Sequence, residues 1–339
     1  TSSHCDWSSD VCSSDLCSDE SILLPFLKKN VFSVLHRYIP YGVPANYLTL
    51  VSIFVIWSCF LYFIGIDTAD EGDIIIAFFA IIIYVIFDHF DGLQAKITAT
   101  GSPLGEILDH YSDVFNGSII LYLFFRILQI ELDWIFYLAI WLNLVAFTLT
   151  YLEQSIQKEL HFGKIGSLEG VVLILLIICS FMTSQGKTFW LEYTMLDMPV
   201  YVFLVLGLIL GVIYTVVGSI RRLQHIPKSF IHYLLTGSIL YFLCIYYQIN
   251  WYIAFLVINV YSADLILKSM KSHLLDAESP KPDFIVYILF LFLIYLSFFE
   301  YEQQIGFLVY GLVVTAKIIW NMVQIFSKFR NYWVWWNLH

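Results

Sequence analysis

The sequence predicts an all-α, polytopic membrane protein with about ten transmembrane helices. Of its 339 residues, 60% are hydrophobic and 13% are charged, and the mean hydropathy is +0.78. A soluble domain is typically about 45–50% apolar and about 25% charged, so the composition excludes the soluble classes. The apolar residues also gather in runs of about 20, the length that a helix needs to cross a bilayer.

The N-terminal part of the chain divides into two stretches. Residues 1–16, TSSHCDWSSDVCSSDL, contain neither the basic segment nor the apolar run of a targeting peptide. They resemble a translated sequencing adapter, and we expect them to be an artefact leader outside the fold. Residues 17–45 are expected to form a cytosolic, interfacial segment before the first transmembrane helix.

Ten apolar segments follow, separated by short polar loops. Residues 46–220 are expected to hold the first six helices, residues 221–326 the last four, and residues 327–339 a cytosolic tail. The segments are 46–66, 73–91, 105–129, 133–152, 168–185, 197–220, 230–248, 251–269, 283–300 and 304–326.

Lysine and arginine lie mainly on one side of this arrangement. The N-terminal flank, the even-numbered loops and the C-terminal tail carry Lys28, Lys29, Arg37, Lys96, Lys158, Lys164, Arg221, Arg222, Lys228, Lys268, Lys271, Lys281, Lys328 and Arg330. Of the others, Lys187 lies in an odd-numbered loop, while Arg126 and Lys317 fall within apolar segments. Because cytosolic loops are enriched in basic residues, both termini and the even-numbered loops are expected to be cytosolic.

Four aspartates stand at the cytosolic ends of the second and third segments. Asp88 and Asp91 are spaced i, i+3, and Asp109 and Asp113 are spaced i, i+4, so each pair shares one helix face. Only residues 92–104 connect the two helices, which predicts antiparallel neighbours. The four carboxylates are therefore expected to converge just below the cytosolic surface.

Such a group of carboxylates needs a compensating cation, because like charges in a low-dielectric site repel strongly. Oxygen ligands without Cys or paired His favour Mg²⁺, Mn²⁺ or Ca²⁺. Four carboxylates suit a two-metal site, a common device for displacement at phosphorus. Gly92, Ala95 and Gly105 are small enough to let a ligand approach the helices, and Lys96 could contact a phosphate.

A cation transporter is an alternative interpretation, since acidic residues can line an ion pathway. The later segments, however, hold few ionisable residues apart from Asp264 and Lys317. The acids thus gather at one end of the helices, and no acidic relay crosses the membrane.

The stretch DHFDGLQAKITATGSPLGEILDHYSD resembles the signature of the CDP-alcohol phosphotransferases, Asp-x2-Asp-Gly-x2-Ala-Arg-x8-Gly-x3-Asp-x3-Asp. The four aspartates, both glycines and Ala95 fall in register, whereas Lys96 stands where the family has arginine. Lysine keeps the charge but cannot make the bidentate phosphate contact of arginine. The resemblance identifies the aspartates as metal ligands.

Three further runs are similar to the eukaryotic choline/ethanolamine phosphotransferase branch: VPANYLTL at 43–50, SPLGEILDH at 102–110 and LHFGKIGSLEG at 160–170. The resemblance implies that residues 46–220 carry the catalytic helices. It also implies transfer of phosphoethanolamine or phosphocholine from a CDP ester to diacylglycerol, forming phosphatidylethanolamine or phosphatidylcholine and CMP, with Mg²⁺ or Mn²⁺. A related alternative is transfer from CDP-diacylglycerol to a soluble alcohol such as inositol.

The same resemblance assigns roles to individual residues. His110 is expected to be the general base, supported by Glu169, because an imidazole titrates near working pH and a carboxylate can orient it. Asp113 is the alternative base. Asn46 and Glu106 are expected to help bind the CDP moiety, together with the small residues and Lys96 already described.

The branch also implies a location and partners. We expect an endoplasmic reticulum or Golgi membrane, an active site that faces the cytosol, a homodimer by analogy, and no nucleic-acid partner. The residues leave open the choice between ethanolamine and choline.

Overall fold

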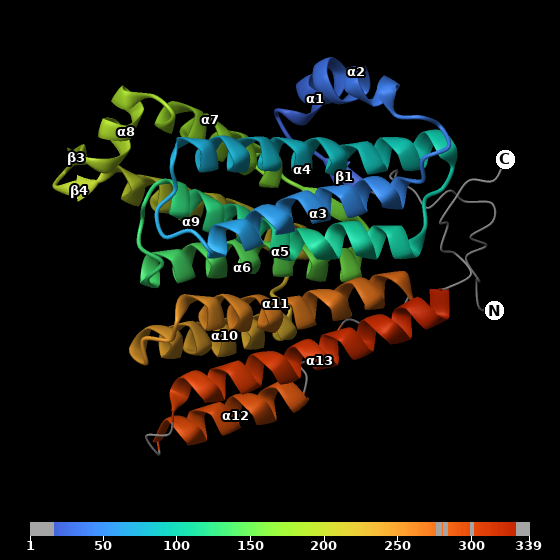
Figure 1. Cartoon of the computed structure of the whole chain (residues 1–339). Helices are drawn as coiled ribbons and strands as arrows, with labels where there is room; N and C mark the ends of the chain where they lie inside the picture. The colour runs from blue at the N-terminus through green and yellow to red at the C-terminus, as the bar shows by residue number, and fades with distance from the viewer. Residues whose placement is uncertain (1–16, 276–279, 281–283, 299–301, 330–339) are drawn as a thin grey trace, which may run out of the picture.

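The computed structural model describes residues 17–275, 280, 284–298 and 302–329, and most of these residues are helical (Figure 1). The long helices are α3 (Ala45–Ile64), α4 (Glu71–Thr98), α5 (Pro103–Ile127), α6 (Trp134–Gln157), α7 (Ser167–Phe181), α9 (Val200–Leu223), α10 (Lys228–Tyr246), α11 (Trp251–Leu274), α12 (Phe284–Phe298) and α13 (Gln303–Phe329). Each of the ten predicted segments coincides with one of them. The protein is thus an all-α polytopic membrane protein.

Seven of these helices are long and apolar enough to cross a membrane, or eight with a bent pair counted as one span. The bent pair is α7 and α8 (Ser184–Leu191), whose axes differ by 113°. The break lies two residues before the predicted end of the fifth segment at 185. Of the other two helices, α5 carries several charged residues, and the apolar part of α12 covers only Phe284–Leu296.

The expected interfacial segment forms short elements that pack against the core. These are β1 (Cys17–Asp19), α1 (Leu24–Leu27), the π-helix η2 (Lys28–Phe32), α2 (Ser33–Leu35) and the 3₁₀-helix η3 (His36–Tyr38). The ring of Phe32 stacks on that of His89 in α4, with 4.4 Å between ring centroids. The sequence did not predict β1, which pairs in parallel with β2 (Leu160–Phe162) and so ties the start of the described chain to the loop after α6. A second small sheet, β3 (Thr194–Met195) with β4 (Met198–Pro199), follows α8.

Local signals fix the ends of the two helices that carry the aspartates. At the start of α4, the Asp70 and Asp73 side chains each accept a hydrogen bond from the other's backbone N–H, at 2.9 Å, which forms a capping box. The helix ends at Thr98, and the φ of the next residue, Ala99, is 53°, in the left-handed region. Ser102 caps α5 by accepting from the N–H of Gly105 at 3.1 Å, with Pro103 in the first turn. These caps set the register of the acidic residues.

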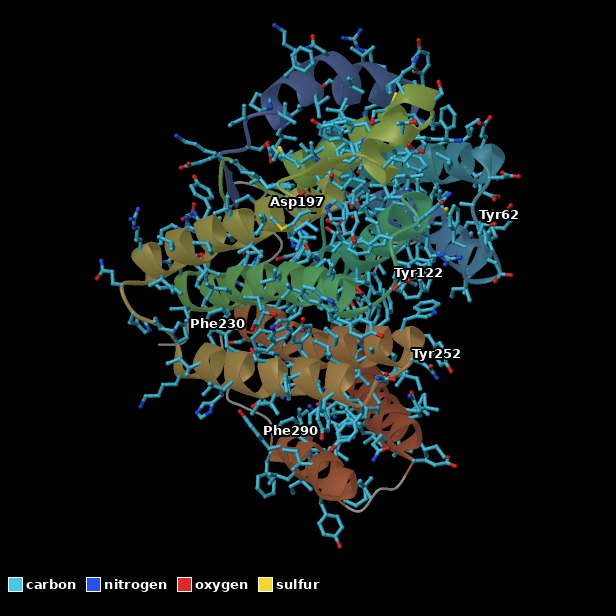
Figure 2. The ribbon with its side chains drawn as sticks, turned by 90° about the vertical axis from the view of Figure 1, so that its left-hand side faces the viewer. Tyr62, Tyr122, Asp197, Phe230, Tyr252 and Phe290 are labelled. Atoms are coloured by element: carbon cyan, nitrogen blue, oxygen red, sulfur yellow. The ribbon has the colours of Figure 1, made fainter. Side chains whose placement is uncertain are left out.

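Helices α4 and α5 run antiparallel, as the short connection predicts, and α3 packs against both of them (Figure 1). On the other side, α11 is the central helix of the second layer and packs against α5, α6, α10 and α13. Tyr122 of α5 lies at this boundary (Figure 2) and stacks on Trp251 of α11, with 5.0 Å between ring centroids. The C-terminal helices are thus packed directly against the helices that carry the site.

Candidate active site

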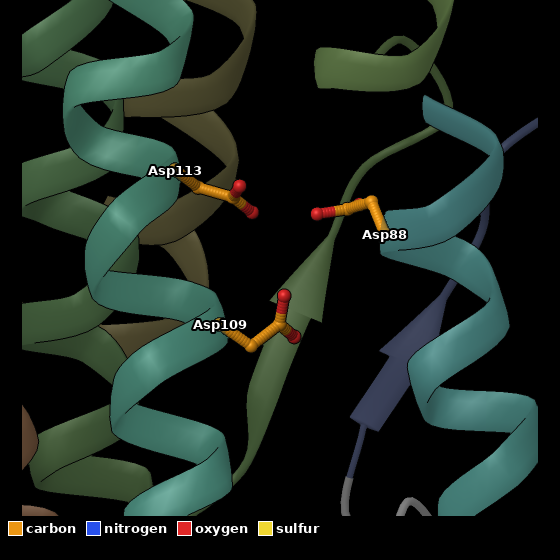
Figure 3. Close-up of side chains that lie close together, drawn as sticks. All are labelled: Asp88, Asp109 and Asp113. Carbon is orange, nitrogen blue, oxygen red and sulfur yellow. The ribbon is translucent and has the colours of Figure 1, made fainter. Parts of the chain in front are cut away.

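Three of the four aspartates lie together between α4 and α5. One carboxylate oxygen from each of Asp88, Asp109 and Asp113 lies within 4.8 Å of the others. Figure 3 shows Asp88 pointing from α4 toward Asp109 and Asp113 on α5. The helical spacing and the antiparallel pairing therefore bring these carboxylates together, as the sequence predicts.

The surroundings of this cluster fit a bound divalent cation. Tyr84 donates a hydrogen bond to Oδ1 of Asp113 at 2.7 Å, but Oδ1 of Asp109 is buried without a hydrogen-bond partner. Buried polar oxygens almost always have a partner, so an orphaned carboxylate oxygen among two other carboxylates marks a place for a cation. Oxygen-only ligands favour Mg²⁺ or Mn²⁺ over zinc or copper.

Asp91, the fourth aspartate, lies beside this group and faces α3. Its Oδ2 accepts a 2.5 Å hydrogen bond from the hydroxyl of Thr49, and its side chain is buried. Asp91 is close enough to Asp88 and Asp109 to interact with them electrostatically. The structure thus places three aspartates in one cluster and fixes the fourth at its edge.

The residues expected to bind the CDP moiety lie near the C-terminal end of α4 and the N-terminal ends of α3 and α5. Asn46 is buried, and a Cβ atom added at Gly105 would lie 2.6 Å from its Oδ1, so a larger residue at position 105 would force the Asn46 side chain to move. Gly92 is exposed, with open space where its Cβ would be. Ala95 is partly buried and Lys96 is exposed on the same last turns of α4. A ligand could therefore reach this surface of α4.

His110, the expected base, is one residue from the cluster. Its Nε2 lies 3.5 Å from Oδ2 of Asp109, and its Nδ1 is buried without a hydrogen-bond partner. Tyr151 of α6 donates to its backbone carbonyl at 3.1 Å. Glu106, one turn earlier, accepts a 3.3 Å hydrogen bond from Gln154 of α6. Both residues are anchored to α6 and only partly buried.

Glu169 caps the first turn of α7 and holds the N-terminal segment. Its Oε1 accepts hydrogen bonds from the Ser21 hydroxyl at 2.5 Å and the Leu23 N–H at 3.2 Å. Its Oε2 accepts from the N–H of Gly166 at 2.8 Å. Among the described residues, these are the hydrogen bonds of this carboxylate, and none of them joins it to His110.

Two residues that hold the aspartates were not identified from the sequence. Thr49 restrains Asp91, and Tyr84 restrains Asp113. Tyr84 precedes Asp88 by four residues and so lies on the same face of α4, a spacing that could have indicated it. Nothing in the sequence around Thr49 indicates its contact, because α3 and α4 meet only through tertiary packing.

A family model for the CDP-alcohol phosphatidyltransferases matches residues 43–217, which is just over half of the chain and includes every expected site residue. The chain belongs to this family. The aspartate signature had predicted the membership, and the match confirms it. The three clustered aspartates lie within the matched region.

Known members of the family are distant relatives of this chain. An uncharacterized CDP-alcohol phosphatidyltransferase class-I family protein of Schizosaccharomyces pombe is 26% identical over 254 residues, 66% of this chain and 64% of that protein. Cholinephosphotransferase 1 of Bos taurus is 25% identical over 200 residues, and that of Homo sapiens is 25% identical over 203 residues. Each of these two alignments covers 56% of this chain and 48% of the relative.

Proposed function

We propose that this protein transfers phosphoethanolamine or phosphocholine from its CDP ester to diacylglycerol. The products are phosphatidylethanolamine or phosphatidylcholine and CMP, as in phospholipid biosynthesis. The observation that carries the proposal is the convergence of Asp88, Asp109 and Asp113 in a chain of the CDP-alcohol phosphatidyltransferase family. The similarity to cholinephosphotransferase 1 supports an amino-alcohol donor.

Asp88, Asp109 and Asp113 would hold Mg²⁺ or Mn²⁺, and Asp91 lies where it could join them in a two-metal site. Bound metal ions would neutralise the donor's pyrophosphate and the charge that develops on departing CMP. Thr49 and Tyr84 hold two of these carboxylates in place by hydrogen bonds, which limits their reorganisation when the donor binds.

His110 would accept the proton of the diacylglycerol hydroxyl as that oxygen attacks the phosphorus. An imidazole is neutral for much of the working pH range and can take up a proton, whereas Asp113 is a weaker base while it ligates a metal. The orphaned Nδ1 of His110 is an atom that could take part. Glu169 would support His110 from the first turn of α7, and Asp113 remains the alternative base.

The remaining expected residues would bind the donor. Lys96 is exposed beside the open surface at Gly92, where a phosphate can approach. Asn46 and Glu106 would contact the CDP moiety from α3 and α5, and Ala95 and Gly105 would lie beside the same moiety.

The proposal includes an orientation. From the distribution of basic residues, both termini and the site would face the cytosol. By analogy with the branch, the membrane would be that of the endoplasmic reticulum or Golgi, and the protein would be a homodimer. Protease or antibody access to a C-terminal tag in sealed microsomes tests the orientation, because a lumenal tag would be protected.

The decisive experiment supplies microsomes containing the protein with diacylglycerol, Mn²⁺ and labelled CDP-ethanolamine or CDP-choline. Labelled phospholipid from at least one of the two donors is the expected result. The absence of labelled phospholipid with both donors would contradict the proposal. A parallel reaction with CDP-diacylglycerol and labelled inositol tests the related transferase alternative. Cation flux into proteoliposomes without CDP-alcohol turnover would favour the transporter.

A further inference from the structure

A cavity lies between the N-terminal segment and the last turns of α4. Its volume is about 290 Å³, far more than one water molecule needs. Figure 1 shows α1 and α2 of the N-terminal segment above α4. The side chains that line the cavity include Ser33, His36, Arg37 and Tyr41 of this segment and Gln94 and Ile97 of α4.

The cavity is separate from the aspartate cluster. Ile97 follows Asp88 by about two and a half turns of 3.6 residues, so the two side chains lie on opposite faces of α4. None of the lining residues named above is expected to bind the metal or the CDP-alcohol. The cavity therefore needs an explanation of its own.

His36 is a buried polar group beside this cavity. The residue is 7% exposed, and Nε2 of its ring is buried without a hydrogen-bond partner. The ring packs edge-on against Phe90 of α4, with 5.4 Å between ring centroids. Because buried polar atoms almost always have a partner, an unpaired nitrogen at the wall of a cavity indicates a polar ligand.

Arg37 adds an uncompensated positive charge. Its side chain is exposed, and the described part of the chain offers it neither an ion pair nor a hydrogen bond. No Asp or Glu occurs between residues 21 and 66, whereas Lys28, Lys29 and Arg37 all do. Because the fork of a guanidinium matches the oxygens of a phosphate, a phosphate group is the anion that suits this position.

Exposed apolar side chains surround the same cavity. Tyr41 is 62% exposed and Ile97 is 56% exposed, and Val34 and Leu35 of α2 are exposed as well. Apolar side chains beside basic ones are typical of a segment in the membrane interface, where they insert among lipids while the basic groups meet phosphates. A soluble phosphate compound would leave these apolar side chains uncovered, so the phosphate of a membrane lipid fits better.

We propose that this cavity binds the phosphate group of an anionic phospholipid from the surrounding membrane, held by Arg37 and His36. A zwitterionic lipid fits less well, because its ammonium would lie near the guanidinium of Arg37 and repel it. This lipid site goes beyond the transfer reaction proposed above and does not depend on it.

A bound lipid would join the N-terminal segment to the helix that carries Asp88 and Asp91. Nε2 of Gln94 already donates to the backbone carbonyls of Pro40 and Val43, at 3.2 and 2.6 Å, and Gln94 is buried. These hydrogen bonds lie one turn after Asp91. The lipid would therefore reinforce a junction next to the active site.

The test measures lipid binding to the purified full chain in detergent. The protein is titrated with dioleoyl phosphatidic acid or dioleoyl phosphatidylcholine, and bound lipid is counted by native mass spectrometry. Arg37→Gln removes the guanidinium, and His36→Phe removes Nε2 but keeps a ring to pack against Phe90. Lys29→Gln is the matched control, because it removes the same charge from an exposed position of the same segment that does not line the cavity.

Wild type is expected to bind phosphatidic acid more tightly than phosphatidylcholine. Arg37→Gln and His36→Phe should each weaken phosphatidic acid about tenfold, the effect of losing a hydrogen bond to a charged group. Lys29→Gln should leave its affinity unchanged. Glycerol 3-phosphate, added as a soluble competitor, should not displace the lipid at equal concentration.

Equal losses in Lys29→Gln and Arg37→Gln would overturn the inference, since they would show attraction to a basic surface without a site. Unchanged affinity in both Arg37→Gln and His36→Phe would overturn it as well. Displacement by glycerol 3-phosphate would show that the cavity takes soluble phosphate compounds and that the lipid is assigned wrongly.

Two further results keep this test independent. If His36→Phe fails to accumulate, Arg37→Gln decides, because Arg37 is exposed and contributes little to packing. If wild type turns over neither CDP-alcohol, the proposed function fails, while the lipid titrations still decide whether this cavity binds an anionic phospholipid.

Discussion

Among the clustered aspartates, Asp109 is the residue that we expect an added cation to affect most. Its Oδ1 is buried without a partner and lies among the carboxylates of Asp88 and Asp113. Replacing it by alanine removes a ligand without leaving a charge behind. We therefore expect this carboxyl to serve the reaction rather than the packing of the fold.

Asp109→Ala is expected to lower transferase activity by at least about 100-fold while the protein still accumulates in membranes. The cause is weaker metal binding. Activity is measured in microsomes over a range of Mn²⁺ concentrations. Glu131→Ala, in the exposed loop before α6, is the control and should leave activity unchanged. Near-normal turnover of Asp109→Ala would mean that the metal site was assigned wrongly.

His110→Ala tests the general base. We expect kcat to fall by about 10²–10⁴-fold with little change in the KM of the donor, because proton transfer contributes only in the transition state. The measurement is steady-state kinetics at saturating Mn²⁺. A small loss would transfer the role to Asp113. Glu169→Gln, assayed alongside, should resemble wild type if Glu169 serves only the N-terminal segment.

At the scale of elements, the contact between α3 and α5 depends on Gly105. An added Cβ would lie 2.6 Å from Oδ1 of Asn46, and Asn46 is buried, so its side chain would have to move. Gly92 is the natural comparison, since nothing lies within 4 Å of its missing Cβ. One methyl group thus has different consequences at two glycines of the same motif.

Gly105→Ala is expected to destabilise the protein by about 1–3 kcal/mol and to lower donor affinity, because the displaced Asn46 would no longer face the ligand. Gly92→Ala should keep or slightly raise the melting temperature, since alanine favours a helix over glycine by about 1 kcal/mol. Any activity lost in Gly92→Ala would then report contact with the donor. Thermal unfolding in detergent and donor KM distinguish the two variants, and equal melting temperatures would contradict this account.

At the scale of the whole molecule, an ion-pair network joins α11 to α13. Asp264 is 4% exposed; its Oδ1 lies 2.5 Å from Nζ of Lys317 and its Oδ2 lies 2.9 Å from Nζ of Lys268. A transport pathway through the later helices would need Asp264 as an acidic residue. Asp264 is instead paired with two lysines. This pairing favours a structural role for Asp264.

Asp264→Ala is expected to destabilise the protein by about 3–5 kcal/mol, because two lysines would lose their partner inside the bundle. The double variant Asp264→Ala/Lys317→Ala should recover part of the loss by removing one of the unpaired charges. Melting temperatures of the single and double variants give the measurement, with donor KM as a check that the site is intact. A single variant as stable as wild type would show that the network contributes little.

The sequence by itself determined the helical spans and the acidic site, because both depend on local periodicity. Apolar runs of bilayer length predicted the helices, and the spacing of Asp88, Asp109 and Asp113 predicted their convergence. The break between α7 and α8 was missed, since the run continues through Met182 and Thr183. The pairing of β1 with β2 was missed because strands so far apart in sequence leave no local pattern.

Tertiary structure alone decided which side chains meet from distant helices. In the folded chain, Thr49 donates a hydrogen bond to Asp91, and Glu169 accepts one from Ser21 of the N-terminal segment. His273 of α11 lies beside Glu106 of α5. No spacing rule connects residues more than 40 positions apart, because their contact depends on how whole helices pack. The acidic residues of the site could therefore be predicted from one stretch of sequence. The residues that contact them could not, because the fold brings them there.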